Sequence, residues 1–445
     1  MYFFIFGKYI NPIHAMKYIA LLIGLSISFL TASGQESMNA TTSDPQKMGW
    51  MKGFPPDKDS ILSALDGSFF RFPALRYSVS HMREFLPTKV VQASMNRYVF
   101  ALNPDANIDT ISFLPWKSKS RMTWQESLSS NYTDGIIILH KGKIVYEKYF
   151  GSLTADGVHA VMSVSKTFTG TVGALLAEEG VLDETKTASY YVPELKNSAF
   201  GDATIRQVLD MTTALQYSED YANPNSEIWT FSAAGNPFPK PKDYTGPTNY
   251  YEYLETVKKN GKHGDAFAYK TINTDALGWI ISRVTGKSIP ELLSEKIWQP
   301  LGTHHDGYYQ IDGSGIAFAG GGFNCNLRDA AMFGEMIRNN GYFNNKQILP
   351  ARVIASIRQG GNQKAFERAG YKDLKNWSYR NMWWITHNQN GAFAARGVHG
   401  QTIYIDPAAQ MVIVRFASHP IAGNAANDPF SLPAYQAIAD YLVTK

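Results

Sequence analysis

The chain has 445 residues, of which 44% are hydrophobic and 18% are charged, and it contains a single cysteine. These values describe a globular protein of two to three structural units, at a prior of roughly 150 residues per domain. They exclude a disordered chain, a collagen-like repeat and a disulfide scaffold. The 42 Lys and Arg residues exceed the 38 Asp and Glu residues only slightly. Because no basic stripe is present, nucleic acid is not an expected partner.

Residues 1–34 have the features of a signal peptide. Met16 and Lys17 precede an apolar stretch, and small residues from Thr31 to Gly34 follow where a signal peptidase would cut. The apolar stretch is shorter than the roughly 20 residues that a membrane span needs, which favours cleavage over an uncleaved anchor. We therefore expect an exported protein, periplasmic or secreted, with no stable membrane insertion after cleavage. The polar, turn-rich residues 35–50 predict a flexible leader.

The remaining elements predict an extension followed by one mixed domain. Residues 51–130 contain hydrophobic clusters interrupted by proline, which is typical of an N-terminal extension packed on a main domain. Residues 136–140 and 143–150 flank Lys141-Gly142 and predict a β-hairpin, and residues 401–405 and 411–416 predict a second one. Helical spacing of apolar residues predicts helices over 165–179, 276–284, 327–339 and 432–443. Residues 131–445 are therefore expected to form an α/β (α+β) sandwich, with one antiparallel sheet built from hairpins far apart in the chain.

Ser163 and Lys166 are the first candidates for chemistry. They stand three residues apart at the start of the helix predicted over 165–179, so their side chains share one face. A serine hydroxyl becomes an effective nucleophile when a nearby base removes its proton, and a lysine of lowered pKa can be that base. The alternative is that both residues simply lie in the solvent-exposed first turn of a helix and have no catalytic role. The sequence has no Gly-x-Ser-x-Gly motif that would supply a competing nucleophile.

Two further segments complete the candidate site. Tyr269 lies in the loop before the helix predicted over 276–284, where its phenol could transfer protons; a packing tyrosine is the alternative. Gly397 and His399 lie at the entry of the strand predicted over 401–405, where glycine lets a substrate approach backbone N–H groups. An ordinary strand entry with a structural His399 is the alternative there. Without a His-Glu-x-x-His or phosphate-loop motif, neither a metal ion nor a cofactor is expected.

Taken together in this order, Ser163-x-x-Lys166, Tyr269-x-Thr271 and the glycine-rich entry at Gly397 resemble the serine β-lactamase and penicillin-recognising family, and within it the class C-like esterases and amidases. Residues 218–224, 274–279 and 398–401 are similar to the 6-aminohexanoate-dimer hydrolases of that family, which cleave linear amides and carboxylic esters. The resemblance covers residues 131–445. It implies a β-lactamase-like sandwich with an additional all-helical or loop subdomain.

The resemblance also implies a reaction. The chain is expected to be a serine hydrolase that cleaves a small-molecule ester or linear amide through an acyl-enzyme on Ser163. Lys166 would act as general base, and Tyr269 would pass the proton to the leaving group.

Binding residues are expected on two segments. The oxyanion would rest on the backbone N–H groups of Ser163 and Val398, beside Gly397 and His399. The aromatic and acidic loop 217–229 suits a lid over the site, in which Tyr217 and Asp220 would contact substrate, although a packed surface loop is an equal alternative.

The motifs depart from the family pattern at two positions. Thr271 stands where Asn or Ser is common, and Arg396 stands where a Lys or His normally faces a β-lactam carboxylate. The second departure lowers the expectation of antibiotic hydrolysis. A β-lactamase or D-peptidase, a transacylase, and a catalytically silent envelope binding protein remain alternatives. The intact set of Ser163, Lys166 and Tyr269 argues against the silent protein.

Overall fold

The structure, a computed structural model, describes residues 38–445. The signal peptide predicted over residues 1–34 lies outside the described residues. Within residues 38–445, no helix is both long enough and apolar enough to cross a membrane.

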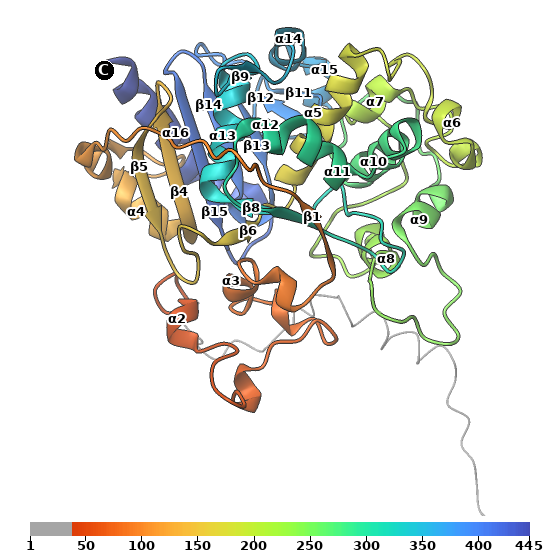
Figure 1. Ribbon diagram of the computed structural model, residues 1–445, viewed down its shortest axis with the longest axis horizontal. Helices are drawn as coiled ribbons and strands as arrows, with labels where there is room; N and C mark the ends of the chain where they lie inside the picture. Colours follow the sequence, from red (N-terminus) through yellow and green to blue (C-terminus); the bar gives the residue numbers. More distant parts are fainter. Residues whose placement is uncertain (1–37) are drawn as a thin grey trace, which may run out of the picture.

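A seven-stranded antiparallel sheet forms the centre of the molecule (Figure 1). Its strands, in spatial order, are β11 (Ser378–Arg380), β12 (Trp383–Ile385), β13 (Phe393–Arg396), β14 (Thr402–Asp406), β15 (Met411–Ala417), β4 (Thr133–His140) and β5 (Lys143–Tyr149). The central neighbours β15 and β4 come from opposite ends of the domain and pair from Met411 opposite His140 to Ala417 opposite Thr133. The predicted sheet of chain-distant hairpins is therefore confirmed.

The turn between β4 and β5 shows why the first hairpin forms. Lys141 and Gly142 have φ values of 50° and 75°. Positive φ at both central residues defines the type I′ turn, whose twist matches that of the two strands it joins.

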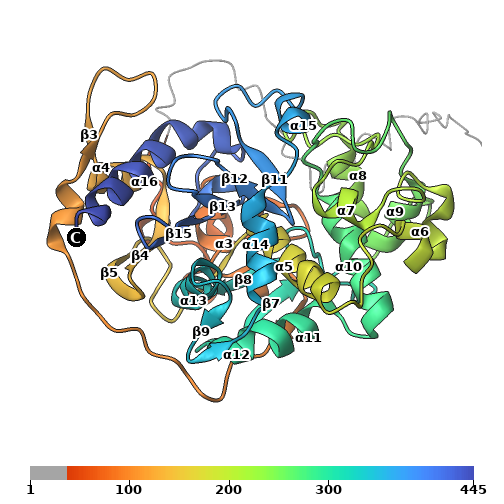
Figure 2. The ribbon, with the colours of Figure 1, turned by 90° about the horizontal axis from the view of Figure 1, so that it is seen from above.

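Helices cover both faces of this sheet (Figure 2). Alternate residues of β4 divide between two hydrophobic cores: Ile137 and Leu139 face one, and Ile136 and Ile138 face the other. The helices α5 (Val164–Glu178), α13 (Leu327–Arg338) and α14 (Ala351–Gln359) pack on the first core, and α4 (Trp124–Ser130) and α16 (Asp428–Val443) pack on the second. This is the expected sandwich.

A second, four-stranded sheet and a helical region lie beside α5. The sheet runs β1 (Thr88–Val91), β7 (Gly307–Gln310), β8 (Phe323–Asn326), β6 (Val158–Ala160). The helical region comprises α6 (Ala188–Tyr191), α7 (Ile205–Leu209), α8 (Glu227–Ala234), α9 (Tyr250–Thr256), α10 (Ile272–Thr285), α11 (Ile289–Leu293) and α12 (Gln299–Leu301). Shorter elements are β2 (Ser112–Phe113), β3 (Met122–Thr123), β9 (Tyr342–Phe343), β10 (Lys346–Gln347) and α15 (Gln363–Glu367). The helix α5, which begins directly after Ser163, thus lies between the main sheet and the helical region.

The N-terminal segment packs against the domain below the second sheet in Figure 1, through α2 (Pro45–Met48) and α3 (Leu75–Ser78). The buried guanidinium of Arg76 is 3.4 Å from Asp134 at the start of the main sheet. It also donates to the hydroxyl of Ser43, which is fully buried. Within residues 38–50 of the predicted leader, Ser43 and Pro45 are buried, and Arg76 also donates to the carbonyl oxygen of Ala40, so this part of the leader contacts the domain.

Candidate active site

Ser163 follows a strained turn and precedes the first turn of α5. Met162 has a φ of 47°, a left-handed conformation that residues with a Cβ rarely adopt. Such conformations persist where the surrounding structure enforces them, and they cluster at functional sites. The turn places Ser163 at the N-terminus of α5, where unpaired backbone N–H groups favour negative charge.

Lys166 lies one helical turn further and contacts Ser163 directly. Its Nζ donates to Ser163 Oγ at 2.8 Å and to the carbonyl oxygen of Gly320 at 2.6 Å. The side chain is almost fully buried, with 1% of its surface exposed. The structure thus brings together the two residues whose helical spacing predicted a contact.

Burial also determines the charge of Lys166. Desolvation lowers its pKa to about 8, and the carboxylates of Glu219 and Asp275 oppose this change. Burial raises the pKa of Asp275, which Lys166 in turn opposes. Asp275 Oδ1 accepts the backbone N–H of Gly320 at 3.2 Å, so one peptide segment contacts both the carboxylate and the lysine. A lysine in this setting is neutral in a mildly alkaline solution and can then accept a proton.

Tyr269 faces the same pair from the loop before α10. The centroid of its ring is 5.1 Å from Lys166 Nζ and 5.3 Å from the ring of Trp384. Burial, followed by the charge of Glu219, raises the pKa of Tyr269, and a hydrogen bond with Ser163 acts in the opposite direction. Tyr269 is therefore a neutral phenol, which can donate its proton.

Gly397, at the end of β13, approaches the backbone of the nucleophile turn. A Cβ at this position would be 2.8 Å from the carbonyl oxygen of Val161 and 3.0 Å from the backbone nitrogen of Ser163, so only glycine fits. Among the described residues, the backbone N–H groups of Ser163 and Val398 have no hydrogen-bond acceptor. These are the two donors that the sequence predicts for an oxyanion.

His399 also lies at the site, where its uncharged imidazole forms part of the wall. It has a φ of 62°, and its Nδ1 is 2.7 Å from the carbonyl oxygen of His419, which fixes the proton on Nδ1. Burial lowers the pKa of His399 to about 4. The ring therefore carries no charge near neutral pH.

The structure does not bring Tyr217 or Asp220 to the site. Tyr217 is buried against Phe231 and Tyr253 in the core, and Asp220 is exposed and accepts the backbone N–H of Ala222 at 3.0 Å. Their neighbours in the loop take the predicted positions instead, since Glu219 and Tyr221 line the cavities around Ser163.

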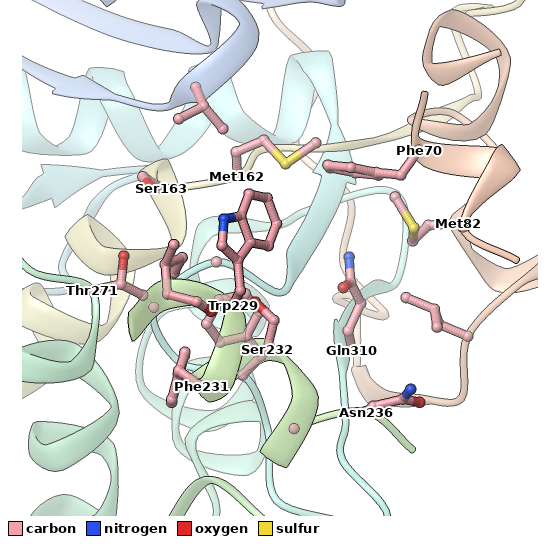
Figure 3. A pocket seen from close by; sticks show the side chains of 18 of the residues that line it. Phe70, Met82, Met162, Ser163, Trp229, Phe231, Ser232, Asn236, Thr271 and Gln310 are labelled. Carbon is pink, nitrogen blue, oxygen red and sulfur yellow. Dashed lines mark hydrogen bonds between the residues drawn. The ribbon is translucent and has the colours of Figure 1, made fainter. Parts of the chain in front are cut away.

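Two cavities meet at Ser163, and both are lined by Ser163, Tyr221 and Val398. The first, which we call the apolar pocket, has a volume of about 230 Å³. Its walls are mostly aromatic and aliphatic: Phe69, Phe70, Met82, Leu86, Met162, Ile228, Trp229, Phe231, Phe238, Tyr250 and Phe318. In Figure 3, Phe70 and Met82 project from the N-terminal segment, and Trp229 projects from α8. Two segments remote in sequence therefore enclose this side of Ser163.

The second cavity, which we call the polar pocket, has a volume of about 590 Å³ and contains Tyr269 and several charged side chains. These are Glu219, Lys372, Asp373, Arg396 and Asp428. The buried guanidinium of Arg396 forms an ion pair with Asp428 and lies 5.1 Å from the ring of Trp384. The charge of Arg396 is thus balanced within the protein.

Metal ligands do not gather in the described part of the chain. Within residues 38–445, no three His, Cys, Asp or Glu side chains lie close enough together to hold a metal ion. His305, which follows His304 in the chain, is 3.4 Å from the carboxylate of Asp329.

Comparison with known proteins places the chain in a family. The sequence profile described as Beta-lactamase matches residues 133–432. The 6-aminohexanoate-dimer hydrolase of Paenarthrobacter ureafaciens is 33% identical over 351 residues, which cover 78% of this chain and 86% of that protein.

Comparison with solved structures gives a consistent result. A Bacillus anthracis protein provisionally named as a 6-aminohexanoate-dimer hydrolase superposes with a TM-score of 0.77 at 36% identity, covering 84% of this chain and 96% of the other. EstCE1, described as a hydrolase with promiscuous acyltransferase activity, shares the fold at 16% identity with a TM-score of 0.56, over 71% of this chain and 96% of the other. The chain therefore belongs to the beta-lactamase family and is an enzyme, a serine hydrolase of the esterase and amidase type.

Proposed function

We propose that the protein cleaves a carboxylic ester or a linear amide through an acyl-enzyme on Ser163. The observation that carries this proposal is the 2.8 Å contact between Ser163 Oγ and the buried Nζ of Lys166. A base whose pKa lies near the working pH is the most effective proton acceptor, and burial moves Lys166 toward that range.

In this mechanism, neutral Lys166 accepts the hydroxyl proton as Ser163 Oγ bonds to the substrate carbonyl carbon. The carbonyl oxygen becomes an oxyanion and accepts hydrogen bonds from the backbone N–H groups of Ser163 and Val398. Tyr269 donates its proton to the leaving alcohol or amine as the bond to carbon breaks, and it recovers a proton from Lys166. Water then attacks the acyl-enzyme by the same steps in reverse order and releases the acid.

The ion pair between Arg396 and Asp428 favours this reaction over β-lactam hydrolysis. A free cation at Arg396 would suit the carboxylate of a β-lactam, but Asp428 already neutralises it. A transacylase would use the same acyl-enzyme, with an alcohol or amine in place of water. Adding an alcohol to the assay distinguishes the two, because a transacylase would convert the acyl group mainly to a new ester.

The test is an assay with p-nitrophenyl butyrate, nitrocefin and 6-aminohexanoate dimer, combined with intact-mass detection of the acyl-enzyme. We expect ester or linear-amide turnover with an adduct in the wild-type protein. Ser163→Ala should lose both, by at least about 10²-fold in turnover. Ser130→Ala, an exposed serine of α4 on the opposite face of the sheet, is the matched control and should change neither. Equal turnover by Ser163→Ala would refute the proposal, and silence on every substrate without an adduct would favour a binding protein.

Export is a separate part of the proposal. Its support is the signal-like sequence of residues 16–34, which lies outside the described residues. The mass of the protein recovered from the cell envelope or the culture medium tests it. A mature chain starting near residue 35 is expected, and a full-length chain confined to the cytoplasm would contradict export.

A further inference from the structure

Among the described residues, no carboxylate lines the apolar pocket. Apart from Lys166, the one lysine or arginine of residues 38–445 that lines it is Arg71, whose Nη2 donates to the backbone oxygen of Asp66. The remaining polar groups are neutral, and two of them are already engaged within the protein. Ser232 Oγ donates to the carbonyl oxygen of Ile228 at 2.8 Å, and Asn236 Oδ1 accepts the N–H of Phe238 at 3.0 Å.

The apolar pocket also depends on the N-terminal segment. Phe70, Met82 and Leu86 form a wall opposite α8, and Figure 3 shows Phe70 and Met82 projecting toward the space beside Trp229. Phe70 contacts the ring of His399 edge-on, with 5.9 Å between the ring centroids. These wall residues lie outside residues 133–432, which the family profile matches. Part of the wall of this pocket is therefore supplied by a segment that carries no proposed catalytic group.

The position of Tyr269 assigns the two pockets to the two halves of a substrate. Tyr269 lines the polar pocket and not the apolar one, and a proton donor must lie beside the group that leaves. The leaving alcohol or amine therefore occupies the polar pocket. The acyl group, on the other side of the carbonyl carbon, extends into the apolar pocket.

We propose that the apolar pocket, closed by Phe70, Met82 and Leu86, selects apolar acyl groups and rejects those with a positive charge at their far end. The proposal rests on the proposed function, since it concerns the acyl half of that reaction. Burying an apolar chain is favourable, and each further CH₂ that is buried adds to the gain. An ammonium group in the same place would lose its hydration without finding an anion. A 6-aminohexanoyl group has such an ammonium, so this chain differs in expected preference from the substrate in its relative's name.

The test compares p-nitrophenyl heptanoate with p-nitrophenyl 6-aminohexanoate, because the two acyl groups differ only in a terminal CH₃ or NH₃⁺. Near neutral pH we expect kcat/KM to be at least about 10²-fold higher for the heptanoate, from the cost of burying an unpaired charge. It should also rise by at least about tenfold from the acetate to the heptanoate. Equal kcat/KM for the heptanoyl and 6-aminohexanoyl esters would overturn the inference.

Two variants test whether the apolar pocket causes this preference between acyl groups. Gln310→Glu keeps the shape of a side chain that lines the apolar pocket and adds a carboxylate, so it should raise the relative rate on the 6-aminohexanoyl ester by about tenfold or more. Phe70→Ala removes part of the N-terminal wall and should reduce the preference for heptanoate over acetate. The matched control is Phe54→Ala, because Phe54 belongs to the same segment and is fully exposed. Preferences that are unchanged in both Gln310→Glu and Phe70→Ala would overturn the assignment of this pocket.

The ester assays distinguish an error in the pocket assignment from an error in the proposed function. If the chain is not an ester or amide hydrolase, neither ester is cleaved and no acyl-enzyme forms. If only the pocket assignment is wrong, both esters acylate Ser163, and the terminal charge has no effect on the rate.

Discussion

The apolar and polar pockets share Ser163, Tyr221 and Val398 and differ in all their other lining residues. The apolar pocket has aromatic and aliphatic walls, and part of them comes from the N-terminal segment. The polar pocket contains the ion pair of Arg396 and Asp428. Its walls combine strand residues of the main sheet, such as Trp384, with residues of the helical region, such as Glu219 and Tyr269. Ser163, the proposed nucleophile, therefore lies at the boundary between two different environments. The chemistry at Ser163 is common to any substrate, whereas each half of the substrate meets a different environment.

The change with the largest expected effect removes this common chemistry. Lys166→Met replaces the buried amine by an apolar side chain of similar length. Without a base for Ser163, kcat/KM should fall by about 10³-fold for p-nitrophenyl acetate and p-nitrophenyl heptanoate alike. Steady-state kinetics measure this, and Lys143→Met, an exposed lysine of β5, is the control. A loss confined to one of the two esters would contradict the shared role of Lys166.

The second change also acts on both pockets, through the oxyanion donors. Gly397→Ala places a Cβ 3.0 Å from the nitrogen of Ser163 and 2.8 Å from the oxygen of Val161, so the backbones must separate. We expect kcat to fall by about 10²-fold for both esters, with little change in KM. Gly313→Ala, an exposed position where a Cβ makes only ordinary contacts, is the control. Unchanged kcat in Gly397→Ala would show that this close approach does not serve the reaction.

The third change should affect the polar pocket alone. Asp428→Asn leaves the cation of Arg396 without its partner. An ester whose leaving group carries a carboxylate, such as 4-hydroxybenzoate, should then gain about tenfold in kcat/KM relative to the corresponding methyl ester. The preference between heptanoyl and acetyl groups should stay the same, since it belongs to the other pocket. A change in acyl preference with no gain for the carboxylate would reverse the assignment of the two pockets.

The smallest expected effect concerns pH. Because burial lowers the pKa of Lys166 to about 8, the neutral base accumulates as the pH rises, and kcat/KM should increase through this range and level off above it. The charge of Asp275 raises the pKa of Lys166, so Asp275→Asn should move the rising limb to lower pH. The gain in rate on the acidic side should be less than about tenfold. The exposed Asp220→Asn is the control, and a shift to higher pH in Asp275→Asn would contradict the sign of this interaction.

The sequence predicts the contact between Ser163 and Lys166 well and the pocket walls poorly, for a physical reason. Ser163 and Lys166 meet because three-residue spacing on a helix places two side chains on one face, and α5 has the length that periodicity indicates. The loop 217–221 has no such period. The structure turns Glu219 and Tyr221 toward Ser163, and it turns Tyr217 into the core and Asp220 to the solvent.

The N-terminal wall could not be predicted at all. Phe70 and Trp229 are 159 residues apart in the sequence, and no pattern in either segment points to the other. Their meeting depends on how the N-terminal segment docks, which the buried contact between Arg76 and Asp134 helps to fix. Long-range packing of this kind leaves no local signal in the sequence.

The most direct test of the account is the mass of the acyl-enzyme formed with p-nitrophenyl heptanoate, located by peptide mapping. We expect a heptanoyl group on the peptide that contains Ser163, and none on the protein after Ser163→Ala. Turnover of the ester by the Ser163→Ala variant, or an acyl group on another residue, would contradict it.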